Sequence, residues 1–144
     1  MKICYLDANL LVYIGNTNSP FHKKSLDAII KLTDDRYELV LSSLSLDEYF
    51  HTSLRFSQDS RQVAFKSLTR AYKKLLKLPN IRLINPPLEA KKHLKALNFM
   101  EKFNLHSRDA YHLFIMVGNK VKYLATFDSD FEKVFEKGLI KQFI

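Results

Sequence analysis

Four acidic residues, far apart in the chain, each stand at or near one end of an apolar run. Asp7 closes ICYLD, Glu48 ends VLSSLSLDE, Asp109 begins DAYHLFIMV and Asp128 closes KYLATFD. If the first and last runs are parallel strands, Asp7 and Asp128 leave the sheet at its carboxyl edge, where open α/β folds bind ligands. Carboxylates gathered there raise one another's pKa unless a cation neutralises them. Oxygen ligands of this kind suit Mg²⁺ or Mn²⁺, so the four acids predict a divalent metal site.

The two acids nearest the amino terminus each have an ordinary structural alternative. Asp7 could be the N-cap of a helix that starts in the next residues, a role that Asp often takes. Glu48 follows Ser45 by three residues, which is the spacing of a capping box. Neither acid alone therefore requires a metal.

The two later acids also have structural alternatives. Asp109 falls two residues after Ser107, a helix cap by residue type, and an acid in the first turn complements the helix dipole. Asp128 precedes Ser129, which could cap the short helix that follows. All four acids nevertheless recur at strand ends or helix starts, and an uncompensated set of acids costs stability unless it has a function. This recurrence favours the metal site.

Strands alternate with helices along most of the chain. Short β-rich runs predict strands at residues 3–6, 37–41, 81–84 and 122–126, with a fifth, edge strand in the terminal IKQFI. Between them, apolar periodicity, caps and prolines predict helices at 9–14, 21–32, 46–56, 60–78, 88–103 and 108–118, the last capped by Ser107, and a capping box predicts a short one from 129. This order indicates βαβ units and a mostly parallel sheet of four to five strands, hence an α/β fold.

Composition limits the remaining possibilities. The 144 residues predict one domain, residues 1–144, and nearly half of them are hydrophobic. The single cysteine, Cys4, cannot form an internal disulfide. The start MKICYLD does not resemble a signal peptide, and no apolar run approaches the ~20 residues that span a bilayer, so we expect a cytoplasmic protein with no membrane contact. Three scattered glycines also argue against a P-loop or dinucleotide site.

The charge favours a polyanionic partner. The formal net charge is +8, and the predicted helix at 60–78 contains six basic residues and no acid. Five of them recur at helical spacing, opposite an apolar side: Lys66, Arg70, Lys73, Lys74 and Lys77. They could contact RNA, or they could simply form a solvated outer face.

Four sequence blocks, taken in order, resemble the PIN domain family, in particular the VapC-like ribonuclease toxins. The blocks are YLDANLLVY, SSLSLDEYF, SRDAYHLFIM and YLATFDSDF. The mid-chain acid of the family falls on Glu48 rather than Asp47, because it follows Ser43 by five residues. The resemblance implies catalytic metal ligands at Asp7, Glu48, Asp109 and Asp128, a further metal contact at Asp130, and supporting or substrate-contacting residues at Asn9, Ser43 and Thr126. His112, one turn beyond Asp109, is not included among the catalytic residues.

The resemblance also implies a fold and an activity. The fold would be a three-layer α/β/α arrangement, and the protein would be a Mg²⁺- or Mn²⁺-dependent endoribonuclease, a hydrolase acting on RNA, often a homodimer and blocked by an antitoxin protein. One alternative is a catalytically inactive PIN-fold module that binds RNA or a protein partner. A phosphotransferase of the haloacid-dehalogenase type is disfavoured, because it requires a second aspartate where this chain has Asn9.

Overall fold

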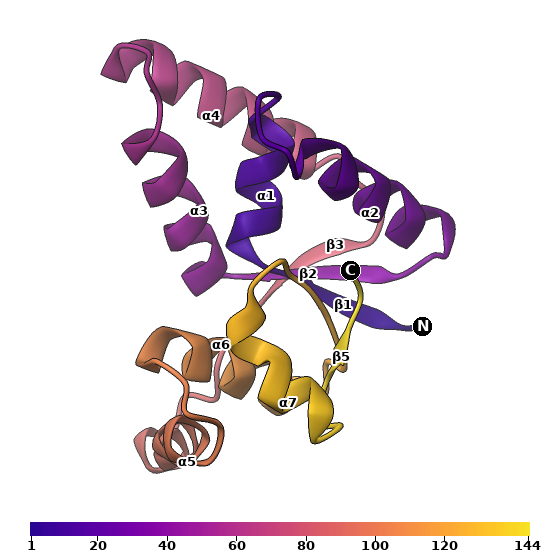
Figure 1. The fold of residues 1–144 in the computed structure, drawn as a ribbon, viewed down its shortest axis with the longest axis vertical. Helices are drawn as coiled ribbons and strands as arrows, with labels where there is room; N and C mark the ends of the chain where they lie inside the picture. The colour runs from indigo at the N-terminus through magenta and orange to yellow at the C-terminus, as the bar shows by residue number, and fades with distance from the viewer.

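A five-stranded, wholly parallel sheet forms the centre of the computed structural model, which describes residues 1–144 (Figure 1). The strand order is β3-β2-β1-β4-β5. The predicted fifth strand is present as a two-residue edge strand. The strands are β1 (Ile3–Leu6), β2 (Glu38–Ser42), β3 (Ile81–Ile84), β4 (Tyr123–Ala125) and β5 (Lys141–Gln142).

Helices cover both faces of this sheet. Figure 1 shows one group above the sheet: α1 (Ala8–Gly15), α2 (His22–Asp34), α3 (Ser43–Arg55) and α4 (Arg61–Leu75). The group below consists of the 3₁₀ turn η1 (Ala90–His93), α5 (Leu94–Phe103), α6 (Ser107–Gly118), the 3₁₀ turn η2 (Ser129–Phe131) and α7 (Glu132–Glu136). The predicted three-layer α/β/α fold is therefore confirmed. None of the helices combines the length and the hydropathy needed to cross a membrane.

Alternation along the strands creates two cores, one on each face. Cys4 and Leu6 of β1 belong to the core beneath α1–α4, whereas Tyr5, between them, belongs to the core beside α5–α7. The middle strand is thus apolar on both faces, as a parallel sheet covered by helices requires.

The order of the strands creates a switch point beside β1. The chain passes from β1 outward through β2 to β3, and it then returns to place β4 on the opposite side of β1. Leu6 pairs with Ala125, and the amide of Asp7 continues the pairing with a 3.1 Å bond to the carbonyl of Ala125. The connections on the two sides of β1 diverge here, so the carboxyl ends of β1 and β4 border the crevice where such folds place ligands.

Two predicted helices are shorter than expected. The helix predicted at 60–78 is α4, capped by the Ser60 side chain at the amide of Val63, and it ends at Leu75 in a turn before Pro79. The helix predicted at 88–103 is regular only from Leu94 onward, because the residues after Pro87 form a bend and then η1. Neither difference affects the switch point.

Candidate metal centre

Five carboxylates and one imidazole gather at the carboxyl edge of β1 and β4. They form two neighbouring groups, and within each the potential ligand atoms lie within 4.8 Å of one another. The two groups also interact electrostatically, because the Asp7 carboxylate is one of the charges that raise the pKa of Asp109. The first group is Asp7, Glu48 and His112, and the second is Asp109, Asp128 and Asp130.

Asp7 is the most buried of the acids, with 7% of its surface exposed. Its Oδ1 accepts a 2.7 Å hydrogen bond from the amide of Ala8, so Asp7 is indeed the N-cap of α1. Its Oδ2 accepts a 2.6 Å bond from the hydroxyl of Thr126. Burial raises the pKa of Asp7, although both hydrogen bonds oppose the shift. Each oxygen retains a further lone pair, so capping and metal binding do not exclude each other.

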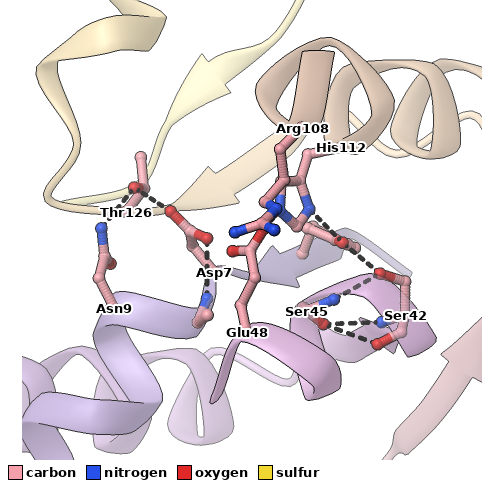
Figure 2. Close-up of polar contacts among 10 residues, drawn as sticks. Asp7, Asn9, Ser42, Ser45, Glu48, Arg108, His112 and Thr126 are labelled. Carbon is pink, nitrogen blue, oxygen red and sulfur yellow. Dashed lines mark hydrogen bonds and ion pairs between the residues drawn. The ribbon is translucent and has the colours of Figure 1, made fainter. Parts of the chain in front are cut away.

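Thr126, directly after β4, connects three of the predicted site residues, and Figure 2 shows its contacts with two of them, Asp7 and Asn9. Its hydroxyl donates to Asp7 and accepts from the side-chain amide of Asn9 at 3.3 Å and from the backbone amide of Asp128 at 3.0 Å. One donated and two accepted bonds use the full capacity of a hydroxyl group. The carboxylate orientation of Asp7 is therefore fixed by both α1 and the β4 loop.

Glu48 extends from α3 into the site, on the side of Asp7 opposite Thr126 (Figure 2). Its Oε1 accepts a 2.9 Å bond from Nε2 of His112 and pairs with Nε of Arg108 at 3.4 Å. The side chain of Arg108 is 63% exposed, so water screens much of this ion pair.

The predicted capping box between Ser45 and Glu48 is wrong. The N-cap of α3 is Ser42, and the box joins Ser42 to Ser45, the third residue of the helix. Glu48 is thereby free of a capping role, and its side chain points toward Asp7. Ser43 is the exposed first residue of α3 and forms no hydrogen bond with the acids.

The second acidic group is more open. Asp109 lies in the first turn of α6, and burial, followed by repulsion from Asp128 and Asp130, raises its pKa to about 6. No side chain or backbone amide is hydrogen-bonded to its carboxylate. Ser107 is not the helix cap as predicted, because α6 already begins at this residue.

Asp128 itself caps the turn η2, where Ser129 was predicted to act. Its Oδ1 accepts a 2.9 Å bond from the amide of Asp130. The predicted capping box from Ser129 to Glu132 is absent, because the N-cap of α7 is Phe131, which forms no side-chain hydrogen bond. The exposed Asp130 completes this group at the outer rim.

Sequence reasoning missed the buried side chains behind Glu48. The hydroxyl of Tyr5 is hydrogen-bonded to Nδ1 of His112 at 2.7 Å and to Oγ of Ser42. The one available signal was the position of His112, three residues beyond Asp109 on the same helix. The partnership with Tyr5 has no signal in the sequence.

The residues present suit a hard divalent cation. Five carboxylates supply oxygen ligands, and the only lysine or arginine that forms an ion pair with any of them is the largely exposed Arg108. Burial, and then repulsion from Asp128 and Asp130, raises the pKa of Asp109, and a bound cation would relieve that repulsion. Mg²⁺ and Mn²⁺ prefer such oxygen-rich sites.

Four residues of the predicted basic stripe lie on α4, which packs on α3, and Lys77 lies in the turn that follows this helix. The five basic side chains are exposed, whereas Ala64 is buried and Leu68 and Tyr72 pack against the upper core. Three of the basic residues, together with Phe65 and Thr69, line a shallow hollow: Lys66, Arg70 and Lys73.

Several solved structures share this fold. Their sequence identity to this chain is low, so the likeness concerns the architecture alone. The structure of Neisseria gonorrhoeae FitAcB is similar, with a TM-score of 0.69 and 14% identity, over 99% of this chain and 97% of that chain. VapBC2 of Rickettsia felis, solved with a promoter DNA fragment, has a TM-score of 0.65 and 16% identity, over 97% and 96%. VapC20 of Mycobacterium tuberculosis, described as a sarcin-ricin loop cleaving toxin, has a TM-score of 0.62 and 15% identity, over 91% and 94%. No curated protein sequence matches the chain.

The family comparison covers nearly the whole sequence. The PIN domain matches residues 4–137, a range that includes all five acids as well as Asn9 and Thr126. The matched range also contains β2, β3 and β4 and all of β1 except its first residue. Together with the fold and the acids at its switch point, this match shows that the chain belongs to the PIN domain family.

Proposed function

We propose that this protein is a VapC-like, metal-dependent endoribonuclease that hydrolyses phosphodiester bonds of RNA in the cytoplasm. The observation that carries the proposal is the convergence of five carboxylates, from four separate segments of the chain, at one switch point. Membership of the PIN domain family and the likeness to VapC20, a sarcin-ricin loop cleaving toxin, support it.

In this proposal Asp7, Glu48, Asp109 and Asp128 hold one or two Mg²⁺ or Mn²⁺ ions, and Asp130 acts through water. A bound divalent ion supplies Lewis-acid chemistry: it makes water a stronger nucleophile near neutral pH and stabilises negative charge that develops on phosphate oxygens.

The side chains around the acids orient them and contact the substrate. Thr126 fixes Asp7, and Asn9 fixes Thr126, so both act on the ligands rather than on RNA. Ser43 is exposed at the start of α3, where it can contact substrate. Arg108 is largely exposed beside Glu48, and its guanidinium has the planar shape that pairs with phosphate oxygens.

The basic stripe on α4 and the turn that follows it is the proposed surface for the flanking RNA. Its five exposed cations offer contacts to successive phosphates without selecting a sequence. The net charge of +8 adds long-range attraction for a polyanion.

Cleavage of total RNA is the direct test. Wild-type protein should cut RNA with Mg²⁺ or Mn²⁺ and stop with a chelator, whereas Asp7→Asn and Asp109→Asn should be inactive but folded. Equal cleavage by clean preparations of both variants would show that these acids are not the catalytic centre.

Calorimetric titration with Mn²⁺ separates the nuclease from an inactive PIN-fold module. The nuclease should show a Mn²⁺ site that Asp7→Asn abolishes. A protein that binds RNA but shows no such site would be the non-catalytic module.

Two protein partners are also proposed: an antitoxin that blocks the acidic site, and a second copy of the chain. The VapBC2 likeness supports the first. Exposed leucines on and before α5 supply apolar surface for a protein contact: Leu88, Leu94 and Leu97. Light scattering tests the dimer, and co-purification with the product of an adjacent gene tests the antitoxin.

A further inference from the structure

A buried chain of three side chains leads from the end of β2 to Glu48. Ser42 Oγ is hydrogen-bonded to the hydroxyl of Tyr5, which is 2.7 Å from Nδ1 of His112, and Nε2 of His112 is 2.9 Å from Oε1 of Glu48. Ser42 and Tyr5 are fully buried, and His112 is 2% exposed. Figure 2 shows His112 between Glu48 on one side and Ser42 on the other. Water therefore cannot substitute for a missing partner in the middle of this chain.

The donor and acceptor of each hydrogen bond in this series can be assigned, starting from the hydroxyl of Ser42. Its Oγ already accepts a 3.1 Å bond from the amide of Ser45, as part of the capping box of α3. The only other partner of this hydroxyl is Tyr5. The hydrogen of Ser42 therefore goes to the Tyr5 oxygen, since a buried hydroxyl with no acceptor is costly.

The directions of the other two hydrogen bonds follow from the donation by Ser42. Because Tyr5 accepts from Ser42, its own hydrogen is free to be donated to Nδ1 of His112. Nδ1 must then be the acceptor nitrogen, so the ring hydrogen lies on Nε2. Nε2 in turn donates to Oε1 of Glu48. Each of the four groups has one consistent role.

We propose that His112 is a positioning residue, which donates from Nε2 to Oε1 of Glu48, leaves Oε2 of Glu48 for the cation and is not itself a metal ligand. The proposal rests on the proposed metal-dependent function and deepens it. It is specific for His112, because no other side chain except Arg108 bonds to Glu48. Ser42 and Tyr5 act one and two steps further back, by fixing which ring nitrogen carries the hydrogen.

The alternative, with His112 as a nitrogen ligand beside Asp7 and Glu48, requires the opposite arrangement. Nε2 would need a free lone pair, so the ring hydrogen would move to Nδ1 and be donated to Tyr5. Tyr5 would then donate to Ser42, whose own hydrogen would have no acceptor in a fully buried site. The capping box of α3 thus opposes ligation by His112.

Nitrogen NMR of the full chain, labelled at histidine, tests the arrangement directly. In metal-free protein the His112 spectrum should show hydrogen on Nε2 and a bare Nδ1, and saturating Mg²⁺ should leave this pattern unchanged. The matched variant Tyr5→Phe should lose the strong preference for this form. Hydrogen on Nδ1 in the wild-type protein, or loss of the Nε2 hydrogen when Mg²⁺ binds, would overturn the proposal.

Mn²⁺ titration of His112 variants provides the second measurement. His112→Leu should bind Mn²⁺ about 10–100-fold more weakly, as expected for loss of a group that orients a ligand. His112→Gln should recover most of the affinity, because its amide can donate to Glu48. His106→Gln, which alters an exposed histidine at the start of the same helix, should bind like wild type. Wild-type affinity in folded His112→Leu, or no recovery in folded His112→Gln, would contradict the positioning role.

Failure of the inference can be told apart from failure of the proposed function. A wild-type protein that binds neither Mn²⁺ nor Mg²⁺ would overturn the proposed function and, with it, the role of His112 toward a cation. The hydrogen-bond chain itself would still be read from the metal-free spectrum. A wild-type protein that binds metal, with hydrogen on Nδ1, would overturn the inference alone.

Discussion

The hydroxyl of Thr126 donates a 2.6 Å hydrogen bond to Oδ2 of Asp7, which lies 119 positions earlier in the chain. The two residues follow adjacent parallel strands, so the contact is made where β1 and β4 both end. Because the same hydroxyl also accepts from Asn9 and from the amide of Asp128, one oxygen atom holds both sides of the switch point together.

Replacement of this hydroxyl should weaken metal binding more than it weakens the fold. Thr126→Val keeps the branched shape but removes the donor to Asp7 and the acceptor for two amides. We expect Mn²⁺ affinity to fall about 10–100-fold and the free energy of unfolding to fall by about 1–3 kcal/mol. Calorimetry and urea denaturation measure the two effects. Thr126→Ser, which keeps the hydroxyl, serves as the control and should retain affinity; equal losses in both variants would exclude the role of this hydroxyl.

The stability of the metal-free protein should depend on pH through Asp109. Its pKa is raised from the model-compound value of 3.8 to about 6, so between these pH values the folded protein binds more protons than the unfolded chain. The free energy of unfolding should therefore fall as pH rises from about 4 to about 6, on account of this group. Thermal unfolding in a chelator, at several pH values, measures the effect.

Asp109→Asn is the matched test of that pH dependence. The amide removes the repulsion from Asp128 and Asp130, so the metal-free variant should melt at a higher temperature than wild type at pH 7, and less of its stability should be lost between pH 4 and 6. Added Mn²⁺ should raise the melting temperature of wild type and not that of the variant. A metal-free variant that is less stable than wild type would show that Asp109 has a structural role instead.

Arg108 should compete with a cation for Glu48. Its guanidinium is 3.4 Å from Oε1 of Glu48, but the side chain is mostly exposed, so the pair is weak. Arg108→Gln should therefore tighten Mn²⁺ binding by no more than about fivefold, while it slows RNA cleavage if Arg108 contacts phosphate. Weaker Mn²⁺ binding in this variant would indicate that Arg108 orients Glu48 rather than competing for it.

Removal of charge from α4 should reduce the salt dependence of RNA binding. We expect the triple variant Lys66→Gln, Arg70→Gln, Lys73→Gln to bind RNA less tightly, with a shallower fall in affinity between low and high salt. The triple variant Lys91→Gln, Lys92→Gln, Lys95→Gln removes the same charge from η1 and α5 and should leave the slope closer to wild type. Asp7→Asn in both backgrounds prevents cleavage during the measurement. Equal losses in the two triple variants would mean that overall charge, not the stripe, attracts RNA.

The strands, and the edge of the sheet where the acids gather, could be predicted from the sequence. Short apolar runs such as the one ending at Leu6 identify buried strands, and parallel pairing determines the edge from which Asp7 and Asp128 emerge. Helix starts were less predictable, since Ser42, Ser43 and Ser45 can all cap a helix. Ser42 is the cap because it is still paired with Ile84 of β3, so the chain cannot leave the sheet earlier. That pairing joins distant segments and has no local signature.

The surroundings of Glu48 were inaccessible for the same reason. Tyr5 and His112 are 107 positions apart, and their contact depends on the face of β1 that α6 covers. Residue type marks His112 as a potential ligand or donor, but its partner determines which of the two it is. The acids could be predicted because their chemistry is unusual in an apolar context, whereas Tyr5 looks like any other core residue.

The placement of β1 between β2 and β4 has a consequence for how the protein is made. β1 is synthesised well before its partner β4 and the last two acids, which lie in residues 123–130. Until residues 123–130 have been translated, a growing chain lacks β4 beside β1 and has three of the five acids, so under the proposed function it should not yet be able to cleave the RNA around it.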